Sequence, residues 1–298
     1  MPEPFLKWVG GKRQLLPAIH ARLPDMSKVD RYVEPFVGGG AVLFHLLEHH
    51  LFDEVHIFDV NPELILCYET IRDDVETVVA SLADLTSTYP RDDLEAQKPV
   101  FYGVRDLWNQ GVGSIGALTP QQRAARVAQM IFLNKTCFNG LYRVNRSGLF
   151  NTPIGRYAQP GFTSPETLRA VSAALAGVQA HHGSFEACKP FVTTSTFAYF
   201  DPPYRPLSNT AAFTSYAKED FNDDGQRGLA AFVQDLDETV PGVRLMLSNS
   251  DPKNTDPNDE FFDDLYQGFA ITRVEANRAI NSDATARGSI TELLITNY

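Results

Sequence analysis

The chain has few cysteines and no long hydrophobic run. Its 298 residues include three cysteines, Cys67, Cys137 and Cys188, which are odd in number and widely spaced. This argues against a disulfide framework and is typical of a reducing cytoplasm. The apolar runs are far shorter than the roughly 18 residues of a membrane-spanning helix, and the first residues lack a signal-peptide pattern. We therefore expect a cytoplasmic protein that does not bind a membrane.

The sequence also lacks cysteines and histidines at metal-ligand spacing. His49-His50 and His181-His182 are adjacent pairs, whereas two ligands on one helix face are offset by about a turn. We interpret both pairs as surface or structural residues and expect no metal cofactor.

Basic residues are in the minority, with 26 Lys and Arg against 37 Asp and Glu and a net charge of -11. A protein that contacts nucleic acid phosphates normally needs a basic surface. The charges are unevenly distributed, however: residues 219–264 hold thirteen acids and three bases, whereas residues 134–157 hold Lys135, Arg143, Arg146, Arg156 and no acid. The basic segment could therefore bind DNA, although two solvated faces would give the same pattern.

One tetrapeptide combines a carboxylate, a rigid turn and an aromatic ring. Asp201-Pro202-Pro203-Tyr204 follows the apolar run Phe197–Phe200, which predicts a strand. The exocyclic amine of a nucleobase is a poor nucleophile, because its lone pair is delocalised into the ring. Asp201 and the carbonyl of Pro202 can accept its two N–H bonds, and Tyr204 can stack on a base rotated out of a duplex. By itself, the tetrapeptide is as compatible with a plain strand end that carries a surface Asp and Tyr as it is with a base-binding site.

A glycine-rich turn lies well upstream. Residues 31–47 predict a short strand, the turn Gly38-Gly39-Gly40 and an apolar helix, so that a ligand can approach the backbone and the helix start. A second predicted strand, Glu54–Phe58, ends at Asp59, about 20 positions after the turn, where open α/β folds bind ribose hydroxyls. The glycines lack the spacing of the dinucleotide-binding fingerprint. A nucleoside ligand without a pyrophosphate therefore fits the turn better than a dinucleotide does. Turns of this kind are also often only structural.

The order of these motifs resembles that of a known enzyme family. Phe36-Val37-Gly38-Gly39 comes first and Asp201-Pro202-Pro203-Tyr204 last, with a long insertion between them. This arrangement is similar to the alpha class, or D12 group, of S-adenosylmethionine-dependent DNA adenine-N6 methyltransferases. Within it the chain resembles the Dam group, and most of all the adenine methylase of Dpn-type restriction systems. The similarity extends over Pro4–Arg13, Phe138–Asn145 and Ser289–Tyr298.

Alternating strands and helices predict a parallel sheet that is covered on both faces. With the resemblance, we expect an α/β fold with a Rossmann-like methyltransferase sheet, mostly parallel with an antiparallel C-terminal strand. Residues 1–62 and 160–298 would form the catalytic domain that binds S-adenosylmethionine. Residues 63–159 would form an inserted target-recognition domain, with helices at Glu63–Leu85 and Gln121–Leu133 and a DNA-contacting β-hairpin at about 134–157.

The resemblance implies that the methyl group of S-adenosylmethionine moves to the N6 amine of a flipped adenine in double-stranded DNA, in the sequence GATC. The sulfonium methyl is already activated, so the reaction needs neither a metal nor a cysteine nucleophile. The implied catalytic residues are Asp201, Pro202 and Tyr204. The implied cofactor-binding residues are Trp8, Lys12, Phe36, Gly38, Gly39, Asp59 and Asp201. The implied DNA-binding residues are Lys7, Asn139, Leu141, Arg143 and Asn145, with Arg143 assigned to one guanine and Lys7 to the other.

The chain departs from the family pattern at Ser184, where the family usually has an acid that helps to hold the cofactor's adenine. Cofactor affinity is therefore expected to be lower unless another residue substitutes. Two alternatives stay open. Cytosine-N4 methylation uses the same amine chemistry, but there Ser more often replaces Asp201. A catalytically silent DNA-binding module is disfavoured by the intact Asp201, Tyr204, Asp59 and Lys12. The sequence leaves the protein partners open; a cognate restriction endonuclease of the same system, without a stable complex, is one candidate.

Overall fold

The computed structural model describes residues 2–205, 221–277 and 289–298. Contacts divide the chain into two compact units. The first comprises Met1–Gly11, Gly38–Glu48 and Asn61–His182, and the second comprises Lys12–Val37, His49–Val60 and Gly183–Tyr298. The predicted domain boundaries at residues 62 and 159 stay predictions. Glu219 and Asp220, the first two residues of the predicted acidic segment, lie outside the described residues.

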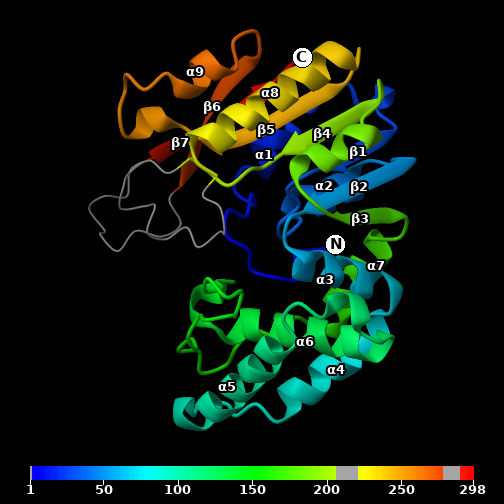
Figure 1. Cartoon of the computed structure of the whole chain (residues 1–298), viewed down its shortest axis with the longest axis vertical. Coiled ribbons are helices and arrows are strands. Elements are labelled where there is room, and N and C mark those ends of the chain that lie inside the picture. Colours follow the sequence, from blue (N-terminus) through cyan, green and yellow to red (C-terminus); the bar gives the residue numbers. More distant parts are fainter. Residues whose placement is uncertain (1, 206–220, 278–288) are drawn as a thin grey trace. The chain divides into compact units, whose positions relative to one another are not determined.

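The strands form a seven-stranded sheet in the order β3-β2-β1-β4-β5-β7-β6 (Figure 1). Strands β2, β1, β4 and β5 pair in parallel, and β7 runs antiparallel to β5 and β6. The predicted fold class, a mostly parallel sheet with an antiparallel C-terminal strand, is therefore confirmed. The strands are β1 (Arg31–Glu34), β2 (Glu54–Asp59), β3 (Val178–His182), β4 (Thr196–Phe200), β5 (Arg244–Ser250), β6 (Ala270–Asn277) and β7 (Ser289–Thr296).

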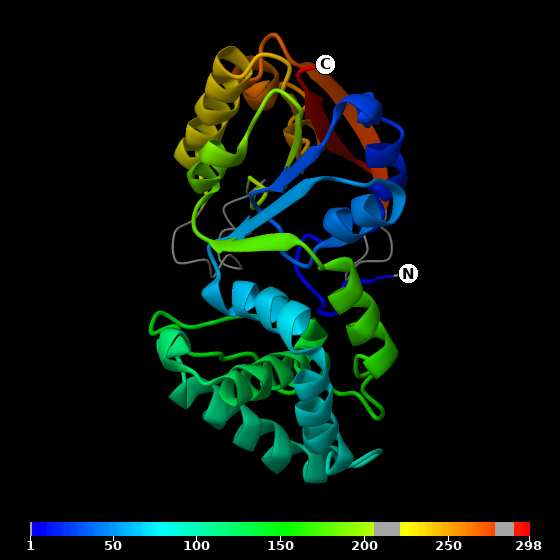
Figure 2. The same cartoon turned by 90° about the vertical axis from the view of Figure 1, so that its right-hand side faces the viewer.

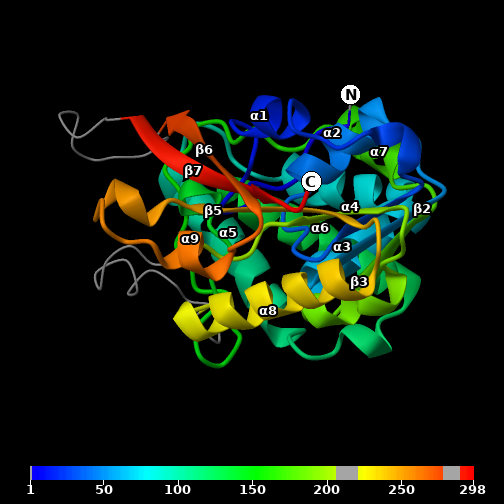
Figure 3. The ribbon, with the colours of Figure 1, turned by 90° about the horizontal axis from the view of Figure 1, so that it is seen from above.

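The central strands are apolar because helices cover the sheet on both faces. All five residues of β4 are buried. Helix α8 (Asp223–Thr239) covers one face and α1 (Leu16–His20) the other (Figures 2 and 3). Leu229 and Val233 of α8 belong to one buried core with Phe200 and Leu247 of the sheet. The short helix α9 (Phe261–Leu265) adds Phe262 to the same core.

The strand order reverses between β1 and β4, which are neighbours in the sheet. Open α/β sheets bind their ligands outside the carboxyl ends of the strands at such a switch point. Phe36 follows β1 and Asp201 follows β4 at this edge. The topology of the second unit therefore puts two predicted site residues where the fold class binds ligands.

The first unit is built around α6 (Pro120–Thr136), which contacts α3, α4 and α5 (Figure 1). A capping box between Thr119 and Gln122 starts α6. Arg126 of α6 donates from Nε to Glu63 of α3 at 2.7 Å, and its guanidinium lies 4.0 Å from the centroid of the Trp108 ring of α5. The other helices of this part are α2 (Ala41–His49), α3 (Pro62–Asp73), α4 (Val75–Ser87), α5 (Leu94–Gln110) and α7 (Pro165–Ala174).

Two features of the local structure were not predicted from the sequence. The sequence did not predict β3, because only Val178 of this strand is buried and no apolar alternation marks it. The predicted helical segment Glu63–Leu85 forms two helices, since Asp74 leaves helical geometry at φ -150° and ψ 57°. The side chain of Asp74 instead accepts a 2.8 Å hydrogen bond from Thr77 at the start of α4.

The predicted β-hairpin at 134–157 is shorter and less regular than expected. Asn134 to Thr136 form the end of α6, in which Asn134 and Thr136 are buried although they are polar. Two isolated antiparallel bridges, Cys137 with Ile154 and Val144 with Phe150, stand in place of continuous strands. We refer to residues 137–155 as the hairpin segment. Its chain reverses, but it lacks the paired strands of a regular hairpin.

Candidate active site

Asp201 follows the buried strand β4, and its side chain is 19% exposed. Lys12 Nζ lies 2.7 Å from its Oδ1, and Ser248 Oγ donates to the same oxygen at 3.1 Å. Burial raises the pKa of Asp201, while the charge and hydrogen bond of Lys12 and the hydrogen bond of Ser248 act in the opposite direction. Within the described residues both donors use Oδ1, so Oδ2 can accept an N–H from a substrate.

The buried hydroxyl of Tyr199 is hydrogen-bonded to Ser248. Tyr199 of β4 and Ser248 of β5 are joined by a 2.9 Å hydrogen bond between their hydroxyl oxygens, and both side chains are fully buried. Burial, followed by the charge of Asp201, raises the pKa of Tyr199 well above its usual value, so its phenol stays neutral. This chain of hydroxyls fixes the side of Asp201 that faces the protein.

Tyr204 is half-buried and has two polar neighbours. The ammonium of Lys12 lies 4.4 Å from the centroid of its ring, a cation–π contact. Its hydroxyl donates to Glu292 of β7. Burial and the nearby charges of Asp201 and Glu292 raise the pKa of Tyr204 well above its usual value, so this hydroxyl stays a donor.

The backbone of the proline turn is held by two buried amides. Gln226 of α8 donates to the carbonyl of Pro203 at 3.0 Å and accepts from Asn249 of β5 at 3.0 Å. Neither amide side chain is exposed. The Oδ1 atom of Asn249 in turn accepts from the backbone N–H of Arg205 at 3.4 Å. The turn is therefore anchored on both sides of Tyr204.

Two predicted cofactor residues of the second unit lie at the carboxyl ends of β1 and β2. Phe36 stacks on Phe185, with ring centroids 5.7 Å apart and an interplanar angle of 27°. Asp59 ends β2, and its carbonyl accepts from the N–H of Gly183 at 3.1 Å. The structure therefore brings Asp59 beside the segment that carries Ser184, the position at which the family usually has an acid.

In the first unit, Trp8 lies directly on the glycine turn. A Cβ atom on Gly38 or on Gly39 would come within 3.0 Å of the Trp8 side chain. Gly38 also has a φ of 48°, which L side chains rarely adopt. Trp8 further stacks on Tyr142, with ring centroids 5.5 Å apart. The glycines are thus required for the packing of Trp8.

Asn139, one of the predicted DNA-binding residues, lies in a tight turn of the hairpin segment. Asn139 and Gly140 have φ values of 56° and 67°, and the N–H of Leu141 donates to the carbonyl of Phe138 at 3.2 Å. This is the geometry of a type I′ turn, for which Asn-Gly is a preferred pair. The turn leaves Asn139 exposed. A Cβ on Gly140 would lie 2.7 Å from the side chain of Lys7, so Lys7 packs on this turn.

Lys7 is fixed beside the hairpin segment by one amide. Its N–H donates to Asn134 Oδ1 at 2.8 Å, and its carbonyl accepts from Asn134 Nδ2 at 2.8 Å. The same Nδ2 donates to the carbonyl of Gly140 at 2.8 Å. The Lys7 ammonium lies 5.5 Å from the centroid of the Tyr157 ring. Two predicted DNA-binding positions that are distant in sequence, Lys7 and Asn139, are thereby neighbours.

Arg143 and Asn145 also make contacts inside the hairpin segment. Arg143 donates from Nε and Nη2 to the side-chain and backbone oxygens of Asn151, at 2.7 and 3.2 Å. Asn145 Oδ1 accepts from the N–H groups of Ser147 and Leu149, both at 3.0 Å. Asn145 therefore has a structural role in the turn, and its contact with DNA stays a prediction.

Sequence reasoning missed the residues that support Asp201 and Tyr204. They are Ser248, Gln226, Asn249 and Glu292. One signal was available: Ser248-Asn249-Ser250 is a polar run directly after the apolar residues Leu245–Leu247. Polar residues at the carboxyl end of a buried strand are candidates for the ligand edge of an α/β sheet.

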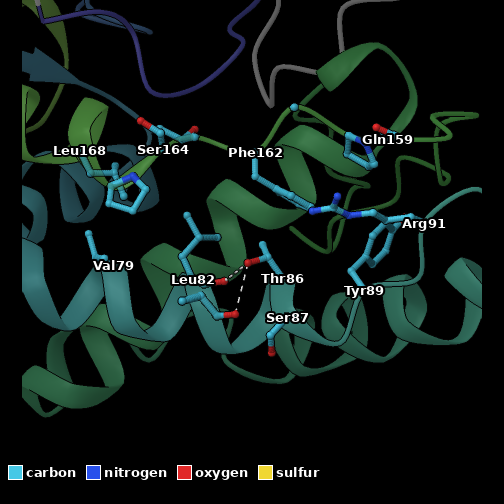
Figure 4. Close-up of a pocket in the computed structure, with 15 residues that line it drawn as sticks. Val79, Leu82, Thr86, Ser87, Tyr89, Arg91, Gln159, Phe162, Ser164 and Leu168 are labelled. Carbon is cyan, nitrogen blue, oxygen red and sulfur yellow. Dashed lines mark hydrogen bonds between the residues drawn. The ribbon is translucent and has the colours of Figure 1, made fainter.

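The first unit also contains a pocket of about 650 Å³ beside α4 and the segment that leads into α7 (Figure 4). Leu82, Thr86, Tyr89, Phe162 and Leu168 are among its lining residues. None of the residues predicted for catalysis, cofactor binding or DNA binding lines it. The candidate site therefore consists of the Asp201 turn and its contacts, and this pocket is not part of it.

Two features are absent from the described part of the chain. No group of three or more His, Cys, Asp or Glu side chains there could hold a metal ion. No helix there is long and apolar enough to cross a membrane.

Three named relatives match the chain over nearly its whole length. It is 46% identical to the type II methyltransferase M.MjaIII of Methanocaldococcus jannaschii, over 99% of both chains. It is 37% identical to the type II methyltransferase M1.LlaDCHI of Lactococcus lactis subsp. cremoris, over 99% of this chain and 95% of the relative. It is 31% identical to a DNA adenine methylase of Vibrio cholerae, over 97% of this chain and 94% of the relative.

A family model agrees with these relatives. The model of the D12 class N6 adenine-specific DNA methyltransferases matches residues 8–280, which include the glycine turn, the hairpin segment and the Asp201 turn. Such an enzyme acts on DNA, and its class implies S-adenosylmethionine as the methyl donor. The chain therefore belongs to the D12 class of N6 adenine-specific DNA methyltransferases.

Proposed function

We propose that this enzyme transfers the methyl group of S-adenosylmethionine to the N6 amine of an adenine that is rotated out of double-stranded DNA, within the sequence GATC. One observation supports the assignment of the reaction to the Asp201 turn. An ammonium group, that of Lys12, contacts both the carboxylate of Asp201 and the ring of Tyr204. The same carboxylate and ring are the two features that a flat, amine-bearing base requires.

Asp201 and Pro202 have the acceptors for the reaction. Oδ2 of Asp201 accepts one N–H of the adenine amine, and the carbonyl of Pro202 accepts the other. These bonds turn the nitrogen lone pair away from the ring and toward the methyl carbon. The N–C bond forms as the C–S bond breaks, and the methylated nitrogen, now cationic, loses a proton to solvent. Asp201 therefore serves mainly to align and polarise the amine.

The side chains present fit the methyl donor in chemistry. The donor supplies a methyl group on a positively charged sulfur. In the second unit, Phe36 offers an aromatic face, Asp59 a carboxylate for ribose hydroxyls, and Lys12 a cation for the methionine carboxylate. In the first unit, Trp8 and the backbone of Gly38 and Gly39 are the corresponding candidates. The geometry of the aromatic pair Phe36 and Phe185 supports this assignment, because Phe185 directly follows Ser184.

The GATC assignment rests on the hairpin segment. Arg143 and Lys7 are the residues suited to guanine O6 and N7 in the major groove. Arg143 donates two hydrogen bonds to Asn151, and these bonds fix the plane of its guanidinium. Lys7 and Arg146 are exposed, as bases that contact DNA must be. Leu141, Asn139 and Asn145 complete the proposed DNA-binding set.

We further propose that the enzyme belongs to a restriction–modification system. The two relatives with 46% and 37% identity are named as type II methyltransferases, and this supports the proposal. The protein partner would then be a cognate endonuclease that shares the DNA sequence without forming a stable complex. We expect the enzyme to act in the cytoplasm.

The test is methylation of unmethylated duplex DNA by the purified enzyme and S-adenosylmethionine, followed by sequencing with base-modification detection. We expect N6-methyladenine in GATC, and none with the Asp201→Ala variant. Methyladenine in another sequence would reject GATC and keep the reaction. N4-methylcytosine would reject adenine as the target, and unmodified DNA would reject the proposed function.

A further inference from the structure

Glu292 lies on β7, next to the strand that carries Ser248. It is paired in register with Ser250 of β5 and with Val274 of β6, and its side chain is half-buried. Its Oε2 atom accepts the hydroxyl of Tyr204. A residue from the last ten positions of the chain thus contacts the aromatic ring of the Asp201 turn.

The position of this carboxylate is not explained by charge. Lys12 is the cation at Asp201, and the charge of Glu292 raises the pKa of Asp201, which works against the ionised form that the reaction needs. A second acid here is therefore unfavourable for Asp201. A charge-assisted hydrogen bond is, however, stronger than a neutral one and holds its donor in a narrower geometry. The contact of Glu292 with the phenol of Tyr204 provides such a bond.

Tyr204 needs such an anchor at the end of its ring. Its backbone is fixed by the contacts of Pro203 and Arg205, but a tyrosine ring can still rotate about two side-chain bonds. Lys12 contacts the ring on its face, and Glu292 holds the hydroxyl. Because the pKa of Tyr204 is raised well above its usual value, the donor is present throughout the working pH range.

We propose that Glu292 is a positioning residue, which holds the hydroxyl of Tyr204 so that the ring is ready to stack on the target adenine. This inference rests on the proposed function. It assigns a role in base binding to the C-terminal strand, and it implies that the hydroxyl of Tyr204 acts only through Glu292.

The test compares Glu292→Ala, Glu292→Gln, Tyr204→Phe and the double variant Glu292→Ala/Tyr204→Phe. Glu275→Gln is the matched control, since it removes a carboxylate from an exposed site on the neighbouring strand β6. Single-turnover methylation is measured at saturating S-adenosylmethionine. The fluorescence of 2-aminopurine at the target position reports how far the base leaves the stack.

We expect Glu292→Ala to lower the methylation rate roughly 10-fold, the size expected for loss of one hydrogen bond to a charged group. The fluorescence of the flipped base should fall, while the KM for S-adenosylmethionine stays unchanged. Glu292→Gln retains an acceptor of the same length and should recover most of the rate. In the Tyr204→Phe background, Glu292→Ala should cause no further loss.

Three results would overturn the inference while the wild-type enzyme methylates adenine. The rate of Glu292→Ala could equal that of Glu275→Gln, its loss could add fully to that of Tyr204→Phe, or Glu292→Gln could fail to recover activity while remaining folded. A wild-type enzyme that leaves adenine unmodified would instead reject the proposed function, and the inference with it. Circular dichroism of the isosteric Glu292→Gln variant separates these results from misfolding.

Discussion

The Asp201 turn and the hairpin segment are both irregular, but they are held in different ways. Residues 201–204 are fixed by side chains from distant parts of the chain: Lys12, Gln226, Ser248 and Glu292. In the hairpin segment, Arg143 and Asn145 bond to near neighbours, Asn151 and Ser147. Other residues of the segment contact distant parts of the chain: Gly140 lies against Lys7, Tyr142 against Trp8, and Phe150 bonds to Asn109. Asp201 and Tyr204 are half-buried, whereas Asn139, Asn145 and Arg146 are exposed.

This difference matches two physical demands. Methyl transfer requires a carboxylate and a ring within a narrow geometry, and long-range packing around a site provides that rigidity. Reading a DNA sequence requires side chains that reach out of the protein to the edges of the bases. A change at the turn should therefore impair the reaction, and a change in the hairpin segment should alter the choice of DNA.

The largest effect is expected from Asp201→Ala. This change removes the proposed acceptor for the adenine amine, and losing one such polar contact typically costs about 100- to 1000-fold in rate. The fold should persist, because the side chain lies at the ligand edge of the sheet and outside the apolar core. Methylation is measured with labelled S-adenosylmethionine, and circular dichroism checks the fold. Near-normal turnover in a folded variant would contradict the proposed mechanism.

Lys12→Met should change the pH dependence. In the proposed mechanism Asp201 acts as a carboxylate, so activity should be present above its pKa and be lost as the pH falls through it. Burial raises this pKa and Lys12 counteracts the rise, so removal of Lys12 should move the acid limb to higher pH, by about one unit or more. The rate is measured against pH at saturating S-adenosylmethionine. Lys189→Met, which removes the partner of Asp235 on the surface, is the control and should leave the limb in place.

Two substitutions of Tyr204 compare the contributions of its ring and of its hydroxyl to the methylation rate. Tyr204→Ala removes the stacking face, which contributes roughly 1–3 kcal/mol per base. Tyr204→Phe retains the ring and should lose less, even though Glu292 loses its donor. Single-turnover rates on one duplex compare the two variants. Equal losses would show that stacking is not the main contribution of this residue.

The same contrast explains how much the sequence predicted. The Asn139-Gly140 turn was predicted, and Asp201 and Tyr204 were proposed as site residues, from neighbouring residues alone: a pair that favours positive φ, a strand end and a proline turn. The mostly parallel sheet followed from alternating strands and helices. Glu292 and Gln226 were not found, because their roles depend on contacts with residues far away in the sequence. Strand β3 was missed for a related reason, since it carries a single buried residue and no apolar pattern.

The smallest effect is expected from Arg143→Ala, and it should appear in the choice of sequence. A bidentate contact with a guanine discriminates by about 1–3 kcal/mol. Arg143 has a guanidinium held by Asn151 and can read one base, whereas Arg146 is exposed beside it and can neutralise a phosphate. Methylation of GATC and of its single-base variants is measured for Arg143→Ala and for the control Arg146→Ala.

Base reading and phosphate binding have different consequences for these two variants. If Arg143 reads a guanine, its loss should relax discrimination at that one position and leave the other positions selective. If it only neutralises a phosphate, its loss should weaken binding to every sequence and flatten the salt dependence, as we expect for Arg146→Ala. A uniform loss with Arg143→Ala would therefore reject its role in reading DNA. It would also remove the difference between a segment that recognises sequence and a surface that is merely basic.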